Sequence, residues 1–161
     1  DKGSPQRQYR LPDGTSINLG AERFRAPEIL FNPSLHGGEG MGLAELTFDT
    51  IRRSDIHVQK EYFSHIVLSG GTTMFPGLSS RLEKDLRQLY LDNVLQGDRA
   101  RAAKFRCCVE DPPRRNHMVF LGASILADVH SEAGPPFWIT RAEYEEHGAN
   151  VVKRLIPTKL S

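Results

Sequence analysis

One stretch of this chain decides its fold: His65-Ile66-Val67-Leu68-Ser69-Gly70-Gly71-Thr72-Thr73-Met74-Phe75-Pro76-Gly77. It opens with a short apolar run that predicts a strand, which stops at the paired glycines. From Pro76 a long helical pattern begins, with four leucines on one face, and it could continue past Tyr90 until Gly97. A strand that runs through a glycine turn into a helix is typical of α/β folds.

The same stretch is also a candidate ligand site. Gly70 and Gly71 carry no side chains, so a phosphate could approach the main chain close to a helix N-terminus. Thr72 could add a hydroxyl donor, and Met74 and Phe75 could form an apolar face for a base or sugar. Two glycines after a strand are more often simply a turn, and the usual phosphate and nucleophile motifs are absent. From the residues alone, both interpretations stay open.

The residues before this stretch predict a lead-in, a hairpin and a short helix. Residues 1–8 are polar and predict a flexible lead-in. Pro12-Asp13-Gly14 separates two short alternating runs, which predicts a β-hairpin because proline presets φ and glycine accepts a positive φ. Within residues 22–31, Pro27 is expected to be the first residue of a short helix.

Residues 32–42 predict a loop, because they contain four glycines and Pro33. Such a segment is either a mobile surface loop or a binding element, and its composition alone favours the mobile loop. The residues after the loop predict an amphipathic helix over residues 43–53 and a second short helix over residues 58–63.

Strand, turn and helix signals alternate towards the C-terminal end. Residues 105–109 predict a strand, and Asp111-Pro112-Pro113 predicts an extended turn. Apolar residues then repeat with helical spacing over residues 118–129, and Gly134-Pro135-Pro136 is expected to break this helix.

A last helix is expected over residues 141–147. Thr140 is a favourable N-cap, and Glu143 stands three residues later as its capping-box partner. Gly148 follows the helix and is expected to end it.

Composition and charge exclude several classes of protein. The 161 residues are 39% hydrophobic and 25% charged, close to globular averages, so disorder along the whole length is not expected. A formal net charge of +1 gives no reason to expect nucleic acid as the main partner.

Apolar runs stay well short of the roughly 18 residues that span a bilayer, and the first residues lack the apolar core of a signal peptide. The adjacent Cys107 and Cys108 are expected to be reduced packing thiols in a cytosolic protein, not metal ligands.

Four stretches closely resemble the actin family: Leu11–Gly14, Glu22–Glu28, Leu68–Gly77 and Phe137–Tyr144. Their order and spacing match the family across nearly the whole chain from Tyr9 onward. The resemblance implies an α/β fold, the C-terminal part of the actin-like ATPase (ribonuclease H-like) fold. In that fold, two lobes surround ATP and a divalent cation.

The resemblance also implies how the chain is divided. Residues 9–38 would be the end of subdomain 4, and residues 39–116 would be part of subdomain 3, with one wall of the nucleotide cleft. Residues 117–161 would be the C-terminal part of subdomain 1.

Three features resemble an actin-related branch of the family more than conventional actin. Residues 88–98 belong to a stretch that is longer than the corresponding actin loop, and Glu110–Gly122 is in the style of that branch. Arg154-Leu155-Ile156-Pro157 lacks the Cys-Phe with which actin ends. This branch supplies a subunit of the complex that nucleates branched actin filaments. The resemblance implies a cytoplasmic, cytoskeletal, ATP-binding template whose partners are a second actin-related protein, other complex subunits and actin.

One wall of the nucleotide site carries over from the family. The implied phosphate- and adenosine-side contacts are Gly70, Gly71, Thr72, Met74 and Phe75, and Phe75 replaces the tyrosine usual in actin. Asn116 stands where the family usually has a lysine near the base, and it cannot lay an aliphatic stem along the ring. The two Asp-Gly loops that hold the phosphates and the metal-bound water are not found in these residues. We therefore expect these residues alone to contain no catalytic or metal-binding group, to bind Mg-ATP weakly and not to hydrolyse ATP.

Two protein-binding surfaces are also implied. The loop from Leu35 to Met41 corresponds to actin's hydrophobic plug, which contacts neighbouring subunits, and these two residues would be its apolar members. Leu126, Val129 and Phe137 correspond to one wall of the barbed-end groove, which takes amphipathic helices and the next subunit. Helix–core packing is the alternative for these three residues, above all for Leu126.

Two other functions compete with nucleation. A conventional actin-like protein would share the fold but form filaments with itself, and the long Leu89–Lys104 stretch argues against it. A sugar kinase of the same ATPase superfamily would need sugar-binding carboxylates and a second Asp-Gly phosphate loop, and the motifs found here point the other way.

Overall fold

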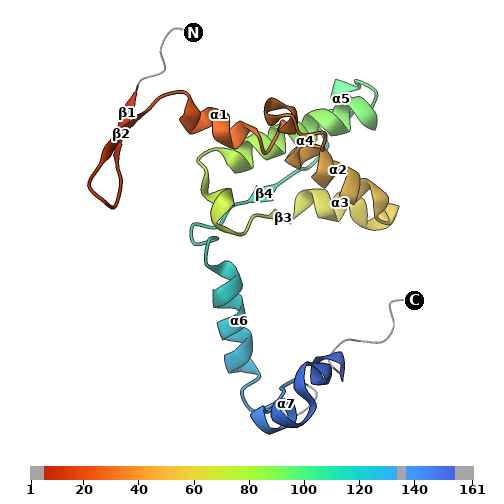
Figure 1. Cartoon of the computed structure of the whole chain (residues 1–161). Coiled ribbons are helices and arrows are strands. Elements are labelled where there is room, and N and C mark those ends of the chain that lie inside the picture. Colours follow the sequence, from red (N-terminus) through yellow and green to blue (C-terminus); the bar gives the residue numbers. More distant parts are fainter. Residues whose placement is uncertain (1–5, 134–136, 155–161) are drawn as a thin grey trace. The chain divides into compact units, whose positions relative to one another are not determined.

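The computed structural model describes residues 6–133 and 137–154, which form two compact units, residues 1–116 and residues 117–161 (Figure 1). The expected break at Gly134-Pro135-Pro136, residues 155–157 and the first five residues of the expected lead-in lie outside the described residues.

The first unit begins with the predicted hairpin. Strand β1 (Arg7–Arg10) pairs antiparallel with β2 (Ser16–Leu19), and Arg10 lies opposite Ser16. In the turn, the Gly14 N–H donates to the Leu11 carbonyl over 2.9 Å, and Gly14 has a φ of 90°, which favours glycine. The hairpin is confirmed, although β1 includes Arg7 and Gln8 of the expected lead-in.

Helix α1 (Glu22–Glu28) contains Pro27 close to its C-terminal end. The prediction that Pro27 would be the first residue of the helix is therefore wrong. Because proline has no N–H to donate, the regular hydrogen-bond pattern cannot continue through it. The N–H groups of Ile29 and Leu30 instead donate to carbonyls three residues back, and the helix ends. A short 3-10 helix, η1 (Pro33–His36), follows.

The helices expected after the glycine-rich loop are both present. Helix α2 (Leu43–Arg53) has the predicted bounds, and α3 (Ile56–Ser64) is longer than the predicted 58–63. The Asp55 carboxylate accepts from the His57 N–H over 2.8 Å, which explains why α3 begins at Ile56.

The two predicted strands pair with each other, but over fewer residues than expected. Strand β3 (Ile66–Val67) lies parallel to β4 (Val109–Glu110), and Ile66 is opposite Val109. The apolar runs predict longer strands because hydrophobicity does not show how far a partner strand extends. The chain crosses between them through α4 (Leu78–Asn93) and α5 (Arg99–Ala102). A crossover of this kind is what a parallel pair requires.

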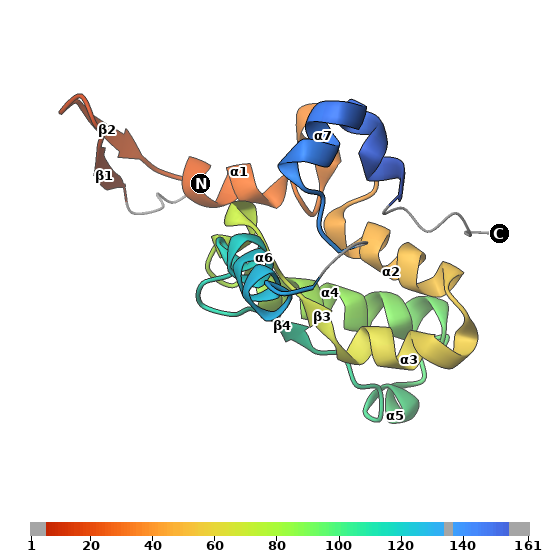
Figure 2. The same ribbon diagram turned by 90° about the horizontal axis from the view of Figure 1, so that it is seen from below.

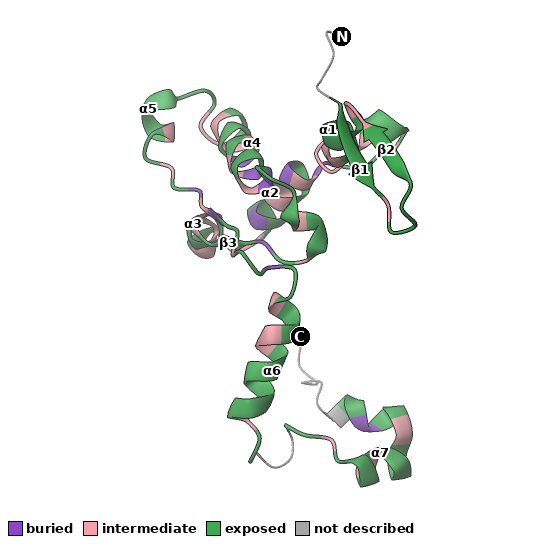
Figure 3. Cartoon of the chain, turned by 90° about the vertical axis from the view of Figure 1, so that its left-hand side faces the viewer, coloured by how far each residue is buried: buried purple, intermediate pink, exposed green. Residues whose placement is uncertain are grey.

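Helix α4 begins two residues after the expected Pro76, because Gly77 adopts a left-handed conformation with φ of 79° before the first helical residue. Its buried face packs against α2, and β4 also contacts it (Figure 2). Phe63, Leu82 and Leu86 are the most deeply buried side chains of the core of this unit. Figure 3 colours parts of α2 and α4 as buried.

The second unit contains α6 (Met118–Val129), α7 (Arg141–His147) and a 3-10 helix, η3 (Gly148–Arg154). Both α-helices have the predicted bounds. The capping box is present, since the Glu143 N–H donates to Thr140 Oγ1 and the Thr140 N–H donates to Glu143 Oε2. Helix α6 buries none of its own residues (Figure 3). Among the described residues, none of the helices is both long and apolar enough to cross a membrane.

Candidate functional site

The paired glycines lead from β3 into a short 3-10 helix, η2 (Gly71–Met74). Gly70 has a φ of 92°, a conformation that side chains other than glycine rarely adopt. Its carbonyl accepts from the Thr73 hydroxyl over 2.8 Å and from the Thr73 N–H over 3.2 Å. The sequence between strand and helix is therefore an ordered turn that is closed by its own threonine.

A second segment of the chain holds this turn. The Gly70 N–H donates to the carbonyl of Arg115 over 2.9 Å, and Ser69 Oγ donates to the same carbonyl over 3.4 Å. The Arg115 side chain also binds the turn. Its Nη2 donates to the Thr73 carbonyl over 2.8 Å, and its Nε donates to Thr73 Oγ1 over 3.1 Å. The turn and the segment that precedes Asn116 are thus joined in both directions.

Arg115 is the one buried charged residue in the described part of the chain, with only 8% of its surface exposed. Its Nη1 also donates to the carbonyls of Asp111 and Pro112, and the Asp111 carboxylate lies 4.0 Å away. This role could not be read from the sequence, because the neighbouring Arg114 is equally basic; in the structure Arg114 is exposed. Only the hydrogen bonds across 42 residues distinguish the two arginines.

The predicted nucleotide contacts lie together in this part of the fold. Gly70 to Phe75 form the turn, and Asn116 follows directly on the Arg115 carbonyl that binds it. Thr72, Met74, Phe75 and Asn116 are all exposed. Their contact with a nucleotide stays a prediction.

The main chain at Gly71 is open enough for a ligand. A Cβ built on Gly71 would meet no atom within 4 Å, and Gly71 does not need a positive φ. Gly71 and Thr72 are the first two residues of η2, where a helix has no preceding carbonyls of its own for its first N–H groups. The open space at Gly71 leaves room for a phosphate oxygen to approach the start of η2, so the residues present fit one side of a nucleotide.

A small cavity of about 240 Å³ lies beside Phe75, between α1 and the start of α4. The Glu28 carboxylate of α1 accepts two hydrogen bonds from Arg81 of α4, over 2.9 and 3.2 Å. Hydrogen bonds from Arg81 to Asp85 and Glu28 raise the pKa of this guanidinium. Arg81 also lies 4.9 Å from the ring centre of Phe31. These contacts tie the C-terminal end of α1 and the residues after it to Arg81 of α4.

Over residues 6–133 and 137–154, His, Cys, Asp and Glu side chains do not gather in groups of three that could hold a metal ion. Cys107 and Cys108 are both free thiols, and Cys107 is buried. Burial raises the pKa of the Cys107 thiol to about 11, although the nearby Arg87 lowers it in part, so this thiol is a poor nucleophile at neutral pH.

The predicted plug residues are Leu35, which lies in η1, and Met41, which lies in the loop between η1 and α2, and both are about half exposed. The loop is held at its C-terminal end, where the Leu43 N–H donates to the Leu30 carbonyl over 2.8 Å. Gly42 lies so close to the backbone that an added Cβ would be 2.0 Å from the Phe31 carbonyl oxygen. The loop therefore presents two apolar side chains from an anchored base, and their role in binding stays a prediction.

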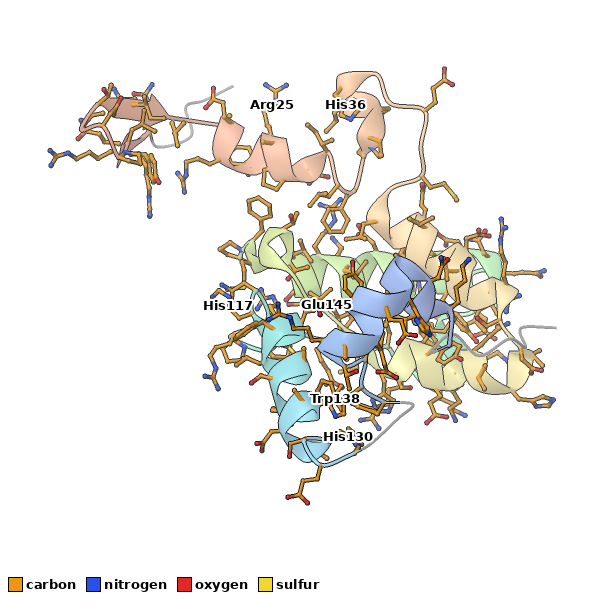
Figure 4. All side chains as sticks on the ribbon, turned by 60° about the horizontal axis from the view of Figure 1, so that its bottom comes forward. Arg25, His36, His117, His130, Trp138 and Glu145 are labelled. Carbon is orange, nitrogen blue, oxygen red and sulfur yellow. The ribbon has the colours of Figure 1, made fainter. Side chains whose placement is uncertain are left out.

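The other predicted interface residues belong to the second unit. Leu126 and Val129 of α6 are 55% and 69% exposed, so helix–core packing does not cover them within the described residues. Phe137 packs its ring against His130, with 4.0 Å between ring centres. The indole N–H of Trp138 donates to the His130 carbonyl (Figure 4). The segment that begins at Phe137 is thereby tied to His130 at the end of α6.

This chain belongs to the actin family, whose sequence pattern it matches over residues 1–157. It is similar to three proteins that are each named actin-related protein 2. The protein of Acanthamoeba castellanii is 50% identical over 147 residues, which is 91% of this chain and 38% of the relative. The Drosophila melanogaster protein is 52% identical over 147 residues, which is 91% of this chain and 37% of the relative. The Caenorhabditis briggsae protein is 55% identical over 141 residues, which is 88% of this chain and 36% of the relative.

The chain therefore spans little more than a third of the length of these relatives. The predicted resemblance to the actin family is confirmed, and so is its narrower form, the similarity to an actin-related branch. The fold is that of the actin family, built here from helices and small sheets. Members of the actin family bind ATP, and the open turn at Gly71 fits that property.

Proposed function

We propose that this chain is the C-terminal part of an Arp2-like subunit of the Arp2/3 complex, which acts as an ATP-binding template for nucleating branched actin filaments. The carrying observation is the identity of 50–55% with three proteins named actin-related protein 2 over about nine-tenths of this chain. The proposed partners are actin-related protein 3, the other subunits of the complex and actin. The proposed location is the cytoplasmic actin cytoskeleton.

Within that protein, this chain would supply one wall of the ATP site. We place residues 9–38 at the end of subdomain 4, residues 39–116 in subdomain 3 and residues 117–161 in subdomain 1. In support, the turn around Gly70 and the segment before Asn116 are hydrogen bonded to each other, and Gly71 is open to solvent. The bound nucleotide would supply the phosphate charge, and the amides of Gly71 and Thr72 would orient it.

Purification of the full-length protein from cell extract tests the assembly. We expect it to co-purify in fixed proportion with actin-related protein 3 and with smaller subunits. The competing function, a conventional actin-like protein, predicts that the purified protein polymerises alone. Self-assembly into filaments, measured by light scattering and electron microscopy, would therefore refute the proposal.

The nucleotide wall is tested separately with Gly71→Val in the full-length protein. The valine side chain would occupy the open space above the turn, so we expect ATP affinity to fall about tenfold, or about 1.4 kcal/mol. Gly40→Val is the matched control, because Gly40 also faces open space but lies on the glycine-rich loop. Equal ATP affinity in the two variants would exclude Gly71 from the site.

We propose that residues 1–161 alone are not an ATPase and bind Mg-ATP weakly or not at all. The reason is that the Asp-Gly loops expected for phosphates and metal-bound water are not found in this sequence. Calorimetry with purified residues 1–161 tests this point, and tight binding that depends on magnesium would contradict it.

A further inference from the structure

Methionine occurs at three positions of the sequence, Met41, Met74 and Met118. Met41 and Met74 have 50% and 40% of their surface exposed, whereas Met118 at the start of α6 is partly buried. Met41 lies in the glycine-rich loop. Met74 is the last residue of η2, on the turn that carries the paired glycines. The turn proposed to face the nucleotide therefore carries an exposed thioether.

The backbone beside Met74 is held by hydrogen bonds. Arg115 donates to the Thr73 carbonyl over 2.8 Å and to Thr73 Oγ1 over 3.1 Å. Thr73 Oγ1 in turn donates to the Gly70 carbonyl over 2.8 Å. Because these bonds hold Thr73, the thioether of the next residue belongs to an ordered turn and needs no local unfolding to reach solvent.

Met74 is followed directly by a second exposed apolar side chain. Phe75 also has 40% of its surface exposed, and it lines the cavity of about 240 Å³ beside α1. Gly71, at the start of the same short helix, faces open space. Thioethers and aromatic rings both pack well against flat rings. Two such side chains on an anchored turn are suited to cover the apolar face of a ligand.

We propose that Met74 is a reversible oxidation site that regulates nucleotide binding, with hydrogen peroxide or another peroxide as the oxidant. With hydrogen peroxide, the Met74 sulfur attacks one oxygen, an S–O bond forms and the O–O bond breaks. The other oxygen leaves as hydroxide, takes the proton of the transferred oxygen and becomes water. The sulfur loses two electrons, which reduce the peroxide. Methionine sulfoxide reductases restore the thioether.

Oxidation changes what the turn presents to a ligand. A flexible apolar thioether becomes a polar sulfoxide, and covering its oxygen with a base costs free energy unless a donor meets it. The sulfoxide should therefore weaken nucleotide binding, and a bound nucleotide should shield the sulfur from peroxide. The inference rests on the proposed ATP site and adds a form of regulation to it.

The first test treats the full-length protein with hydrogen peroxide, with and without saturating Mg-ATP, and follows each sulfoxide by peptide mass spectrometry. We expect Mg-ATP to slow the oxidation of Met74 at least about fivefold. Met41 is the internal control, because it is similarly exposed, lies outside the turn and falls in a different tryptic peptide. Its oxidation rate should not respond to Mg-ATP. An unchanged rate at Met74, in protein that calorimetry shows to bind ATP, overturns this inference and leaves the proposed function standing.

The second test measures ATP affinity before and after peroxide. We expect the affinity of the unaltered protein to fall about tenfold and to recover after treatment with sulfoxide reductases for both epimers. Each variant is compared with itself. Peroxide should change the affinity of Met74→Leu less than about twofold, whereas Met41→Leu should still lose about tenfold.

Two results of this second test overturn the inference. Unchanged affinity in protein that is oxidised at Met74 shows that the sulfoxide has no effect on the site. An equal loss in Met74→Leu assigns the effect to another residue. Absence of ATP binding before any peroxide is added contradicts the proposed function itself, and this inference with it.

Discussion

Arg115 Nη2 donates a hydrogen bond to the backbone carbonyl of Thr73 over 2.8 Å, across 42 residues of sequence. The bond joins the turn that carries the glycine pair to the segment that ends in Asn116. It does so with a buried charge, whose cost is offset by hydrogen bonds to three carbonyls and one hydroxyl. The shape of the proposed nucleotide wall therefore depends on a residue that need not touch the nucleotide.

Removing this guanidinium should loosen the turn. We expect Arg115→Met to reduce stability by about 2–4 kcal/mol, because it removes hydrogen bonds to the partly buried carbonyls of Thr73, Asp111 and Pro112. Hydrogen exchange measured by mass spectrometry should become faster for the peptide containing residues 69–75. Arg114→Met is the matched control, since Arg114 is exposed, and it should change exchange little. Unchanged exchange in Arg115→Met would contradict this positioning role.

The anchor of the glycine-rich loop should not accept a side chain. In Gly42→Ala, the new Cβ would lie 2.0 Å from the Phe31 carbonyl oxygen, so the loop or α2 must move. We expect a loss of stability of about 2–4 kcal/mol, with faster hydrogen exchange at the start of α2. Gly40→Ala, which faces open space, should cost less than about 1 kcal/mol.

The two adjacent cysteines should differ in reactivity. Iodoacetamide at pH 8 is expected to modify the half-buried Cys108 at least about tenfold faster than the buried Cys107, as followed by peptide mass spectrometry. The Cys107 pKa is raised by burial from 9.0 to about 11. Its contribution to stability should therefore be present below pH 9 and decline between pH 9 and about 11, where the unfolded chain ionises first. Equal modification rates would show that Cys107 is accessible.

The ion pair between Glu28 and Arg81 should contribute modestly to the free energy of unfolding. Both side chains are about 40% exposed, so a double-mutant cycle with Glu28→Gln and Arg81→Met should give a coupling of about 0.5–1 kcal/mol. Arg81→Met should cost more than Glu28→Gln, because Arg81 also lies over Phe31 and pairs with Asp85. The coupling should weaken in high salt. A coupling that salt does not change would point to packing instead.

The capping box of α7 gives a local test in the second unit. Thr140→Ala removes a side-chain acceptor for the Glu143 N–H and should destabilise the helix by about 1 kcal/mol. Hydrogen exchange at residues 141–144 should report the loss. Thr140→Ser keeps the hydroxyl and should behave almost like the unaltered protein.

Helices with strong local signals were predictable from the sequence. The bounds of α2, α6 and α7 follow from apolar spacing and from the capping pair, which are properties of neighbouring residues. The hairpin follows from Pro12-Asp13-Gly14 for the same reason. Pro27 was misplaced because proline is tolerated in more than one position near helix ends, and local sequence does not choose among them.

Features that depend on distant segments were not predictable. The lengths of β3 and β4 are set by how far the two strands lie alongside each other, which apolar runs do not record. The role of Arg115 is set by a carbonyl 42 residues away. The nucleotide contacts were named from family resemblance, and the structure brings Gly70 and Asn116 close through the Arg115 carbonyl, while their contact with ATP stays a prediction.

Helix α6 has a consequence for protein quality control. Val119, Phe120 and Ile125 are each more than 60% exposed, and none of the residues of α6 is buried in the described part of the chain. Chaperones and proteases select polypeptides with exposed apolar segments. A copy of the protein in which these side chains stay exposed would carry the signal for retention or degradation.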